Sequence, residues 1–341
     1  MSEIAHPAPD GWLKRFFLSL VILALLAGLL LVPWAVCWLT ASGELDQEEV
    51  VARQAQGEFV LFGPGLAQDI MAYKLALYAA VKPEVVVLGS SRAGNVRAAF
   101  FERPFVNMAG AATDLESLRL LVDRMLAVHR PKVVLLGLDF WWLTAGAPAG
   151  RPERIVQPSL LDASTLRAPW RWLVQGRIAP ADMLAPLQHR LRADRYGLEA
   201  QLRDTGYGPD GSLYEGAVLD GRRPAPDHAF ARTLRELESG SGVWAGSLAP
   251  DRERLEAFAE ICCRLRSRGI RTIVFLPPLA TPVLGALADR NGGDAGWLSA
   301  LRQGLLDCGV ESMDFSDPRV YGSGDCEMMD GLHGGDVIGA S

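Results

Sequence analysis

The chain has 341 residues, of which 49% are hydrophobic and 22% are charged. This length is sufficient for one large domain or two small ones around a buried core, and the composition is that of a folded protein. The formal net charge of −6 argues against a nucleic-acid partner, because such partners usually require a basic surface.

The first predicted element is a transmembrane helix over residues 16–39, which contain no charged side chain. About 20 apolar residues cross a hydrocarbon core as a helix, and tryptophans 12, 34 and 38 lie where the two interfaces are expected. Lys14 and Arg15 precede the segment, whereas acidic residues follow it. The positive-inside rule therefore predicts a cytoplasmic tail at residues 1–15 and a periplasmic or extracytoplasmic remainder, held by a single pass through the inner membrane.

Two other interpretations of this segment stay open. A cleaved signal peptide would use the small residues at 40–43 as its cleavage site, although the apolar run is longer than the usual 7–15 residues. A buried core helix is the third interpretation. The first two interpretations both place the remainder of the chain outside the cytoplasm.

The exported part begins with a predicted acidic stalk and amphipathic segment at residues 40–80, followed by an α/β domain at 81–341. Short apolar runs alternate with segments of helical periodicity, which predicts a doubly wound, mostly parallel sheet. Residues 145–250, rich in Gly, Pro, Arg and Trp, interrupt this rhythm as an insertion. The strands are expected at residues 85–88, 105–107, 132–138, 271–276 and 310–315, and the helices at 114–129, 251–268 and 295–307.

Polar residues and glycines follow several of these strands, at the edge where parallel sheets form their sites. Ser91 follows the first strand, and Asp330 and His333 lie beyond the last one. A serine hydroxyl becomes nucleophilic when a histidine takes its proton, and a carboxylate orients that histidine. The backbone N–H groups of Ser91 and Gly110 are the candidates to stabilise the oxyanion. These residues predict a catalytic Ser–His–Asp set.

These motifs resemble those of the SGNH (GDSL-like) hydrolases. Gly-Ser-Ser-Arg at 89–92 resembles the first conserved block of the family. Gly110 resembles the glycine of the second block, and Asp330-x-x-His333 resembles the last block. The resemblance covers residues 83–341 apart from the insertion. It implies a flavodoxin-like three-layer α/β/α sandwich, with Ser91 as nucleophile, His333 as base and Asp330 as its orienting acid.

Two departures from the family pattern indicate a particular branch. Ser90 stands where the family has Asp, and Asp139 lies in the block that normally offers an Asn to the oxyanion hole. The chain is similar to membrane-anchored members that take part in alginate O-acetylation and D-alanyl transfer to teichoic acid. That resemblance implies O-acylation or deacylation of an exported polysaccharide, and a multi-span membrane O-acyltransferase as partner.

Arg92, Asn107 and Asp139 are the candidates for substrate binding, since they lie at the ends of neighbouring strands. Arg92 next to the nucleophile would suit an acidic sugar or a phosphate, and a salt bridge with Asp139 is the alternative. Tryptophans 141, 142 and 244 are expected in the core rather than stacked on sugar rings.

No cofactor or metal is expected, because none of the five cysteines forms a CxxC pair. Cys308 and Cys326 are either a disulfide or free thiols. Two other functions stay open. The domain could be a non-catalytic scaffold or glycan-binding subunit of a polysaccharide export complex. Nucleotide binding at residues 89–94 has weak support, because the loop lacks both GxGxxG and the P-loop lysine.

Overall fold

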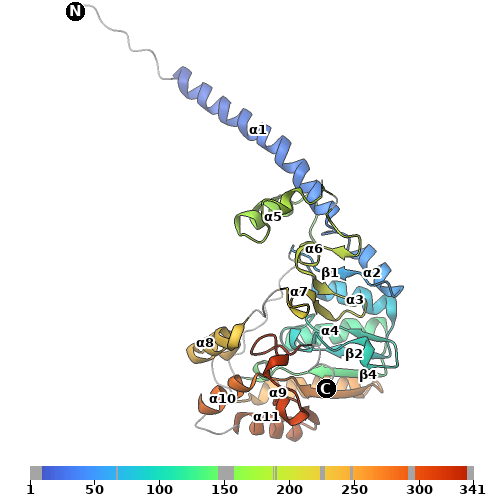
Figure 1. The fold of residues 1–341 in the computed structure, drawn as a ribbon. Helices are drawn as coiled ribbons and strands as arrows, with labels where there is room; N and C mark the ends of the chain where they lie inside the picture. Colours follow the sequence, from blue (N-terminus) through green and yellow to red (C-terminus); the bar gives the residue numbers. More distant parts are fainter. Residues whose placement is uncertain are drawn as a thin grey trace, which may run out of the picture.

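The computed structural model describes residues 10–66, 68–144, 157–186, 188, 190–222, 227–245, 249–290 and 296–335. A long N-terminal helix leads into a globular part that contains two β-sheets. Figure 1 shows this helix, α1, extending away from the rest of the molecule, while the larger sheet lies at the opposite end. The fold is therefore mixed α/β, as the alternation of apolar patterns predicts.

Helix α1 (Asp10–Ala41) contains the predicted transmembrane segment. Residues Gly11–Ala41 are long and apolar enough to cross a membrane, with a mean hydropathy of 2.8 in their most apolar window, none of which is buried. Described side chains from Gly11 to Pro33 are exposed apart from the half-buried Gly28. Burial inside the protein begins only at Ala35. This exposure is incompatible with a buried core helix.

The larger sheet has five parallel strands in the order β3-β2-β4-β8-β9. Four of the five predicted strands are found within one residue of their expected bounds, and the last is shorter than expected. The β-branched run of β2 is an interior strand, in register with β3 on one side and with the central strand β4 on the other. The strands are β2 (Val85–Leu88), β3 (Phe105–Asn107), β4 (Val133–Gly137), β8 (Arg271–Leu276) and β9 (Ser312–Asp314).

Amphipathic helices pack on one face of this sheet. The apolar side chains of α4 and α9 meet alternate strand residues such as Val86 and Leu136 in one continuous core. Asp114 begins α4 as its N-cap and Asp251 does the same for α9. The helices of this layer are α3 (Ile70–Val81), α4 (Leu115–Val128), α9 (Arg252–Arg266), α10 (Thr281–Arg290) and α11 (Gly296–Asp307).

The other face of the sheet carries no α-helix in the described ranges, so the predicted three-layer sandwich is incomplete there. Residues 89–104 connect β2 to β3 through two short 3₁₀ turns instead of a helix, and residues 315–335 form loops and 3₁₀ turns. A cavity of about 400 Å³ lies on this face. Its apolar lining includes Leu135 of β4 and the alternate residues Ile273 and Phe275 of β8, which face the same side of the sheet.

Residues 40–80 are not the predicted stalk. They contain α2 (Gln47–Ala55), β1 (Leu61–Phe62) and α3, and their apolar side chains Val50, Phe62 and Tyr73 are part of the main core. Strand β1 pairs with two strands of the predicted insertion in a second sheet of order β5-β1-β6-β7. The remaining strands are β5 (Arg195–Tyr196), β6 (Thr205–Tyr207) and β7 (Leu213–Glu215), with α6 (Leu198–Arg203) and α7 (Gly216–Leu219) beside them.

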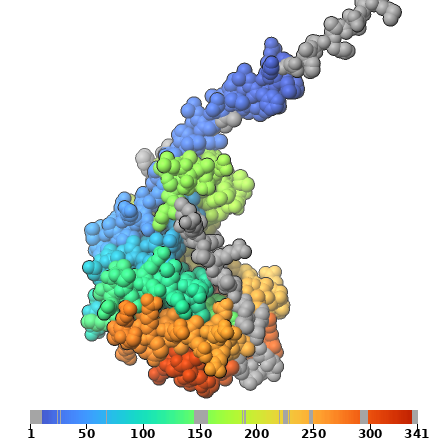
Figure 2. All heavy atoms as spheres, turned by 180° about the vertical axis from the view of Figure 1, so that it is seen from behind, coloured from blue at the N-terminus to red at the C-terminus, as the bar shows by residue number. Residues whose placement is uncertain are grey.

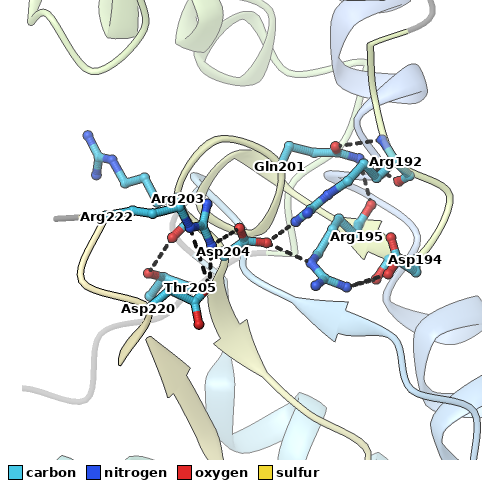
Figure 3. Close-up of polar contacts among 9 residues, drawn as sticks. All are labelled: Arg192, Asp194, Arg195, Gln201, Arg203, Asp204, Thr205, Asp220 and Arg222. Atoms are coloured by element: carbon cyan, nitrogen blue, oxygen red, sulfur yellow. Dashed lines mark hydrogen bonds and ion pairs between the residues drawn. The ribbon is translucent and has the colours of Figure 1, made fainter. Parts of the chain in front are cut away.

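An arginine cluster fixes the start of β6 (Figure 3). The buried carboxylate of Asp204 accepts hydrogen bonds from Arg195 at 3.0 Å, from Arg222 at 2.7 Å and from Arg192. Asp204 has a φ of +52°, a conformation that Asp tolerates better than most residues. These contacts join three segments of the predicted insertion, so residues 192–222 fold as an ordered part of the second sheet.

The C-terminal end of α1 packs against α5 (Ala163–Val174), another helix of the insertion. The Trp34 and Trp170 rings lie 4.6 Å apart, and those of Trp38 and Trp172 lie 5.6 Å apart, measured between centroids. Figure 2 shows α5 as a lobe beside the end of α1. The predicted span is therefore held to the globular part by side-chain packing as well as by its covalent connection to the following residues.

Glu44 connects the end of α1 to the second sheet. Its fully buried carboxylate accepts N–H groups from Gly65 at 3.0 Å, Leu66 at 3.2 Å and Leu198 at 2.5 Å. Burial raises the pKa of Glu44 to about 7, and the three N–H donors only partly oppose it. The folded state therefore holds a proton that the unfolded chain releases near its ordinary pKa of 4.5.

This raised pKa gives a pH-dependent stability. Because the native state binds more protons between about pH 4.5 and 7, the stabilising contribution of Glu44 falls as the pH rises through that window. The unfolding free energy of the wild type relative to Glu44→Gln is expected to decrease from pH 5 to pH 8, measured by urea titration in detergent. Exposed Glu102→Gln is the control and should show no such trend. A constant difference for Glu44→Gln would contradict the prediction.

Candidate active site

Ser91 lies directly after β2, at the carboxyl edge of the five-stranded sheet. Gly89 turns the chain there with a φ of +140°, and a Cβ at this position would come within 2.7 Å of the carbonyl oxygen of Gly137. Ser90 caps the following 3₁₀ turn, since its hydroxyl accepts the backbone N–H of Arg92 at 3.2 Å. The turn therefore presents the Ser91 side chain to the surface, where it is exposed.

Asp330 and His333 lie on a tight turn that reaches the same edge. Met328 and Gly334 form an antiparallel bridge across it, and the N–H of Met329 donates to the carbonyl of His333 at 2.8 Å. Gly331 packs on α8 (Ala231–Ser239), where a Cβ would lie 2.5 Å from the methyl group of Thr233. The turn is thus held against the rest of the domain.

The three predicted catalytic residues meet in one hydrogen-bonded series. Ser91 Oγ lies 2.9 Å from His333 Nε2, and His333 Nδ1 lies 2.9 and 3.0 Å from the two oxygens of Asp330. An ionised carboxylate only accepts, so Nδ1 carries the proton and Nε2 of the neutral ring is left to accept from Ser91. This is the arrangement that allows a histidine to take a proton from a serine.

The surroundings of Asp330 keep its carboxylate ionised. Burial alone would raise its pKa, but the hydrogen bond and charge of His333 and the N–H groups of Leu332 and His333, each at 2.8 Å, lower it to about 2. Arg232 of α8 adds a cation 3.6 Å from the second oxygen. The sequence pattern gave no signal for Arg232, because α8 lies about 100 residues away from the motif.

Arg92 is a structural clamp rather than an exposed anion-binding group. Its side chain is only 3% exposed and forms the alternative salt bridge with Asp139, at 2.9 Å. The same guanidinium donates to the carbonyls of Leu332 at 2.9 Å, Pro277 at 2.8 Å and Pro278 at 2.6 Å. It therefore joins the ends of three strands to the histidine-bearing turn. The predicted substrate-binding role of Arg92 does not agree with this burial.

Asp139 and Asn107 are also buried, which contradicts their predicted contact with substrate. Burial raises the pKa of Asp139 and the charge of Arg92 opposes that rise, so the carboxylate is neutralised by a cation. The Asn107 amide donates to the carbonyls of Ala93 at 2.9 Å and Val96 at 2.8 Å, and its oxygen accepts the N–H of Ala109 at 2.8 Å. Both residues therefore hold the loops after β2 and β3 in place from inside the domain.

The predicted oxyanion hole is only partly available. The N–H of Gly110 donates to the carbonyl of Gly89 at 2.9 Å, so it is not free to bind an oxyanion as expected. Within the described ranges, no acceptor is bonded to the N–H of Ser91. The structure therefore retains one of the two predicted donors.

Other expectations concern residues around the site. Trp142 and Trp244 are buried in the core as predicted, whereas Trp141 is half-buried with its ring 5.4 Å from the Arg92 guanidinium. Cys308 and Cys326 are free thiols. The described residues contain no cluster of His, Cys, Asp and Glu suited to a metal ion.

Comparisons with models of known protein families, with curated proteins and with solved structures find no match. The functional argument therefore depends on the motif residues and on the geometry of the site.

Proposed function

We propose that this chain is a membrane-anchored, extracytoplasmic serine O-acyltransferase or esterase. The observation that carries the proposal is the continuous series of contacts from Ser91 through His333 to Asp330, with both distances near 2.9 Å. Ser91 and His333 are separated by 242 positions in the chain. Ser91, the proposed nucleophile, is exposed, whereas Asp330, the proposed acid, is largely buried. A serine that only capped a turn would not need a histidine oriented in this way.

In the first half of the proposed reaction, Ser91 Oγ attacks the carbonyl carbon of an acyl donor. His333 Nε2 takes the hydroxyl proton, and ionised Asp330 stabilises the resulting imidazolium. The N–H of Ser91, which bonds to no acceptor among the described residues, is the proposed donor that stabilises negative charge on the carbonyl oxygen. The imidazolium then protonates the leaving oxygen, the carbon–oxygen bond to the donor breaks, and the acyl group remains on Ser91 as an ester.

In the second half, His333 removes a proton from an incoming hydroxyl group, which attacks the acyl ester. The proton returns to Ser91 Oγ as the ester bond breaks, so the enzyme is restored. Transfer and hydrolysis differ only in whether a glycan hydroxyl or water enters. The exposure of Ser91 suits a large acceptor, such as an exported polysaccharide, that cannot enter a closed pocket.

The strand order of the sheet supports the resemblance to SGNH hydrolases. Numbered along the chain, the five parallel strands lie in the order 2-1-3-4-5, which is the flavodoxin-like order. The nucleophile follows the first of these strands, beside the point where the strand order reverses. We also propose that α1 spans the inner membrane with its N-terminus in the cytoplasm, and that the partner is a multi-span O-acyltransferase of the same membrane.

A fluorophosphonate probe tests the proposal directly, because it labels serines that a base has activated. Stoichiometric labelling of the purified full chain, located at Ser91 by peptide mass spectrometry, is expected. The competing function is a non-catalytic scaffold or glycan-binding subunit, which is favoured by the engaged N–H of Gly110. That function predicts no labelling above the level of a heat-denatured sample.

The carboxylate of Asp330 is expected to be essential for rate and not for binding. Asp330→Asn can stabilise the wrong histidine tautomer and cannot balance the imidazolium, so kcat on p-nitrophenyl acetate should fall by about 10³–10⁴-fold. Asp317→Asn is the control and should retain activity, because among the described residues the half-buried Asp317 carboxylate bonds only to the side chain and backbone N–H of Arg319, and an Asn oxygen can still accept that N–H. A loss of less than threefold for Asp330→Asn would show that the acid does not orient His333.

A further inference from the structure

Two apolar side chains near α5 are the most exposed large hydrophobic groups among the described residues. Leu161, just before the helix, is 94% exposed, and Val174, its last residue, is 88% exposed. Arg167 and Arg171 are also exposed on this helix, one turn apart. Apolar groups this exposed, next to cations on one helix, are typical of a surface that meets lipid.

The opposite side of α5 is fixed to the end of α1. Trp172 is fully buried against Trp38, and Trp170 packs against Trp34 with the two ring planes tilted by 47°. These pairs hold α5 beside the point where α1 leaves the globular part, as both views show (Figures 1 and 2). The exposed side chains of α5 therefore keep a fixed position relative to the proposed span.

The length of α1 places this contact at the membrane boundary. From Trp12 to Trp34 the helix rises about 33 Å, at 1.5 Å per residue, which is close to the thickness of a hydrocarbon core. Tryptophans prefer the two interfaces. With Trp12 at one interface, Trp34 and the adjacent Trp170 lie at the other, so α5 lies at the level of the lipid headgroups.

We infer that α5 and the preceding turn form a membrane-docking surface on the extracytoplasmic leaflet. Leu161 and Val174 insert into the boundary between headgroups and acyl chains, and Arg167 and Arg171 extend to lipid phosphates. The contact would hold the globular part at a fixed height and orientation on the bilayer. This inference depends on the proposed membrane span of α1, and the occupant is the same bilayer because the docking surface is continuous with that span.

The test uses single cysteines in the full chain after its five native cysteines are replaced. Leu25→Cys reports the span, Val174→Cys reports the docking surface, and Val320→Cys is the matched control. Val320 is also an exposed apolar residue, at 71%, but it follows β9 in the distant sheet. Each site is labelled with the fluorophore NBD, and the protein is reconstituted into phosphatidylcholine–phosphatidylglycerol vesicles with or without doxyl-labelled lipids.

The doxyl lipids are expected to quench the labels at positions 25 and 174 at least about threefold more than the label at 320. Quenching at 25 with position 174 no different from 320 would overturn the docking surface and leave the span intact. Shielding of position 174 from aqueous iodide without doxyl quenching would assign it to a protein contact and equally overturn the inference. Absence of quenching at position 25 would remove the span and the docking surface together, whereas the fluorophosphonate result would still decide the catalytic proposal.

Discussion

Ser91→Ala is expected to lower kcat on p-nitrophenyl acetate by roughly 10⁴–10⁶-fold, the range seen when a serine nucleophile is removed. Among the described residues, the exposed hydroxyl has a hydrogen bond with His333 alone, so its removal leaves no buried polar group without a partner. The variant should therefore unfold at the same urea concentration as the wild type. Initial rates and a urea titration measure the two quantities on the same preparation.

The neighbouring serine provides a matched control. Ser90→Ala removes the hydroxyl that accepts the N–H of Arg92, which is expected to cost about 1 kcal/mol of stability with little change in kcat. Loss of activity in Ser90→Ala together with full activity in Ser91→Ala would show that Ser90, and not Ser91, is the nucleophile. Full activity in both variants would remove the serine mechanism.

Arg92→Met should produce the largest loss of stability, about 3–5 kcal/mol, because it leaves the buried carboxylate of Asp139 without its cation. The carbonyls of Leu332, Pro277 and Pro278 lose their donor in the same step. Arg92→Lys should recover only part of this loss, since an ammonium group cannot reproduce the planar fork that reaches four acceptors.

The measurement is a urea titration followed by tryptophan fluorescence. The control is Arg103→Ala, which breaks an ion pair with Glu84 at 2.6 Å whose arginine is 60% exposed. That change should cost about 0–1 kcal/mol. A loss for Arg92→Met as small as that of Arg103→Ala would mean that the buried pair does not hold the strand ends together.

Much of the fold could be predicted because the signals are local. The strands at 85–88, 105–107 and 271–276 have the predicted bounds, since an apolar run between turn residues specifies a buried strand by itself. Residues 40–80 were misassigned as a stalk because β1 has only two residues, and its partner strands lie more than 130 positions later.

The catalytic residues and the supporting residues differ in how far the sequence could identify them. Ser91, Asp330 and His333 were identified from their chemistry and from their position after strands, and the structure brings them into contact. Arg92 and Asn107 were correctly placed at the site, but their side chains face inward. Whether a polar residue binds a ligand or a backbone carbonyl depends on which loops pack beside it, and no local pattern records that.

The sequence by itself determined the apolar helix at the N-terminus, the five strands of the larger sheet with three of their helices, and the three residues of the proposed triad. Those features depend on periodicity and residue chemistry, which are properties of short segments. Only the tertiary structure decided that Arg92 is buried beneath the site, that the N–H of Gly110 is engaged, and that α5 lies against α1. Hydrogen-bond partners and packing partners come from distant segments, so they are fixed only when the chain folds.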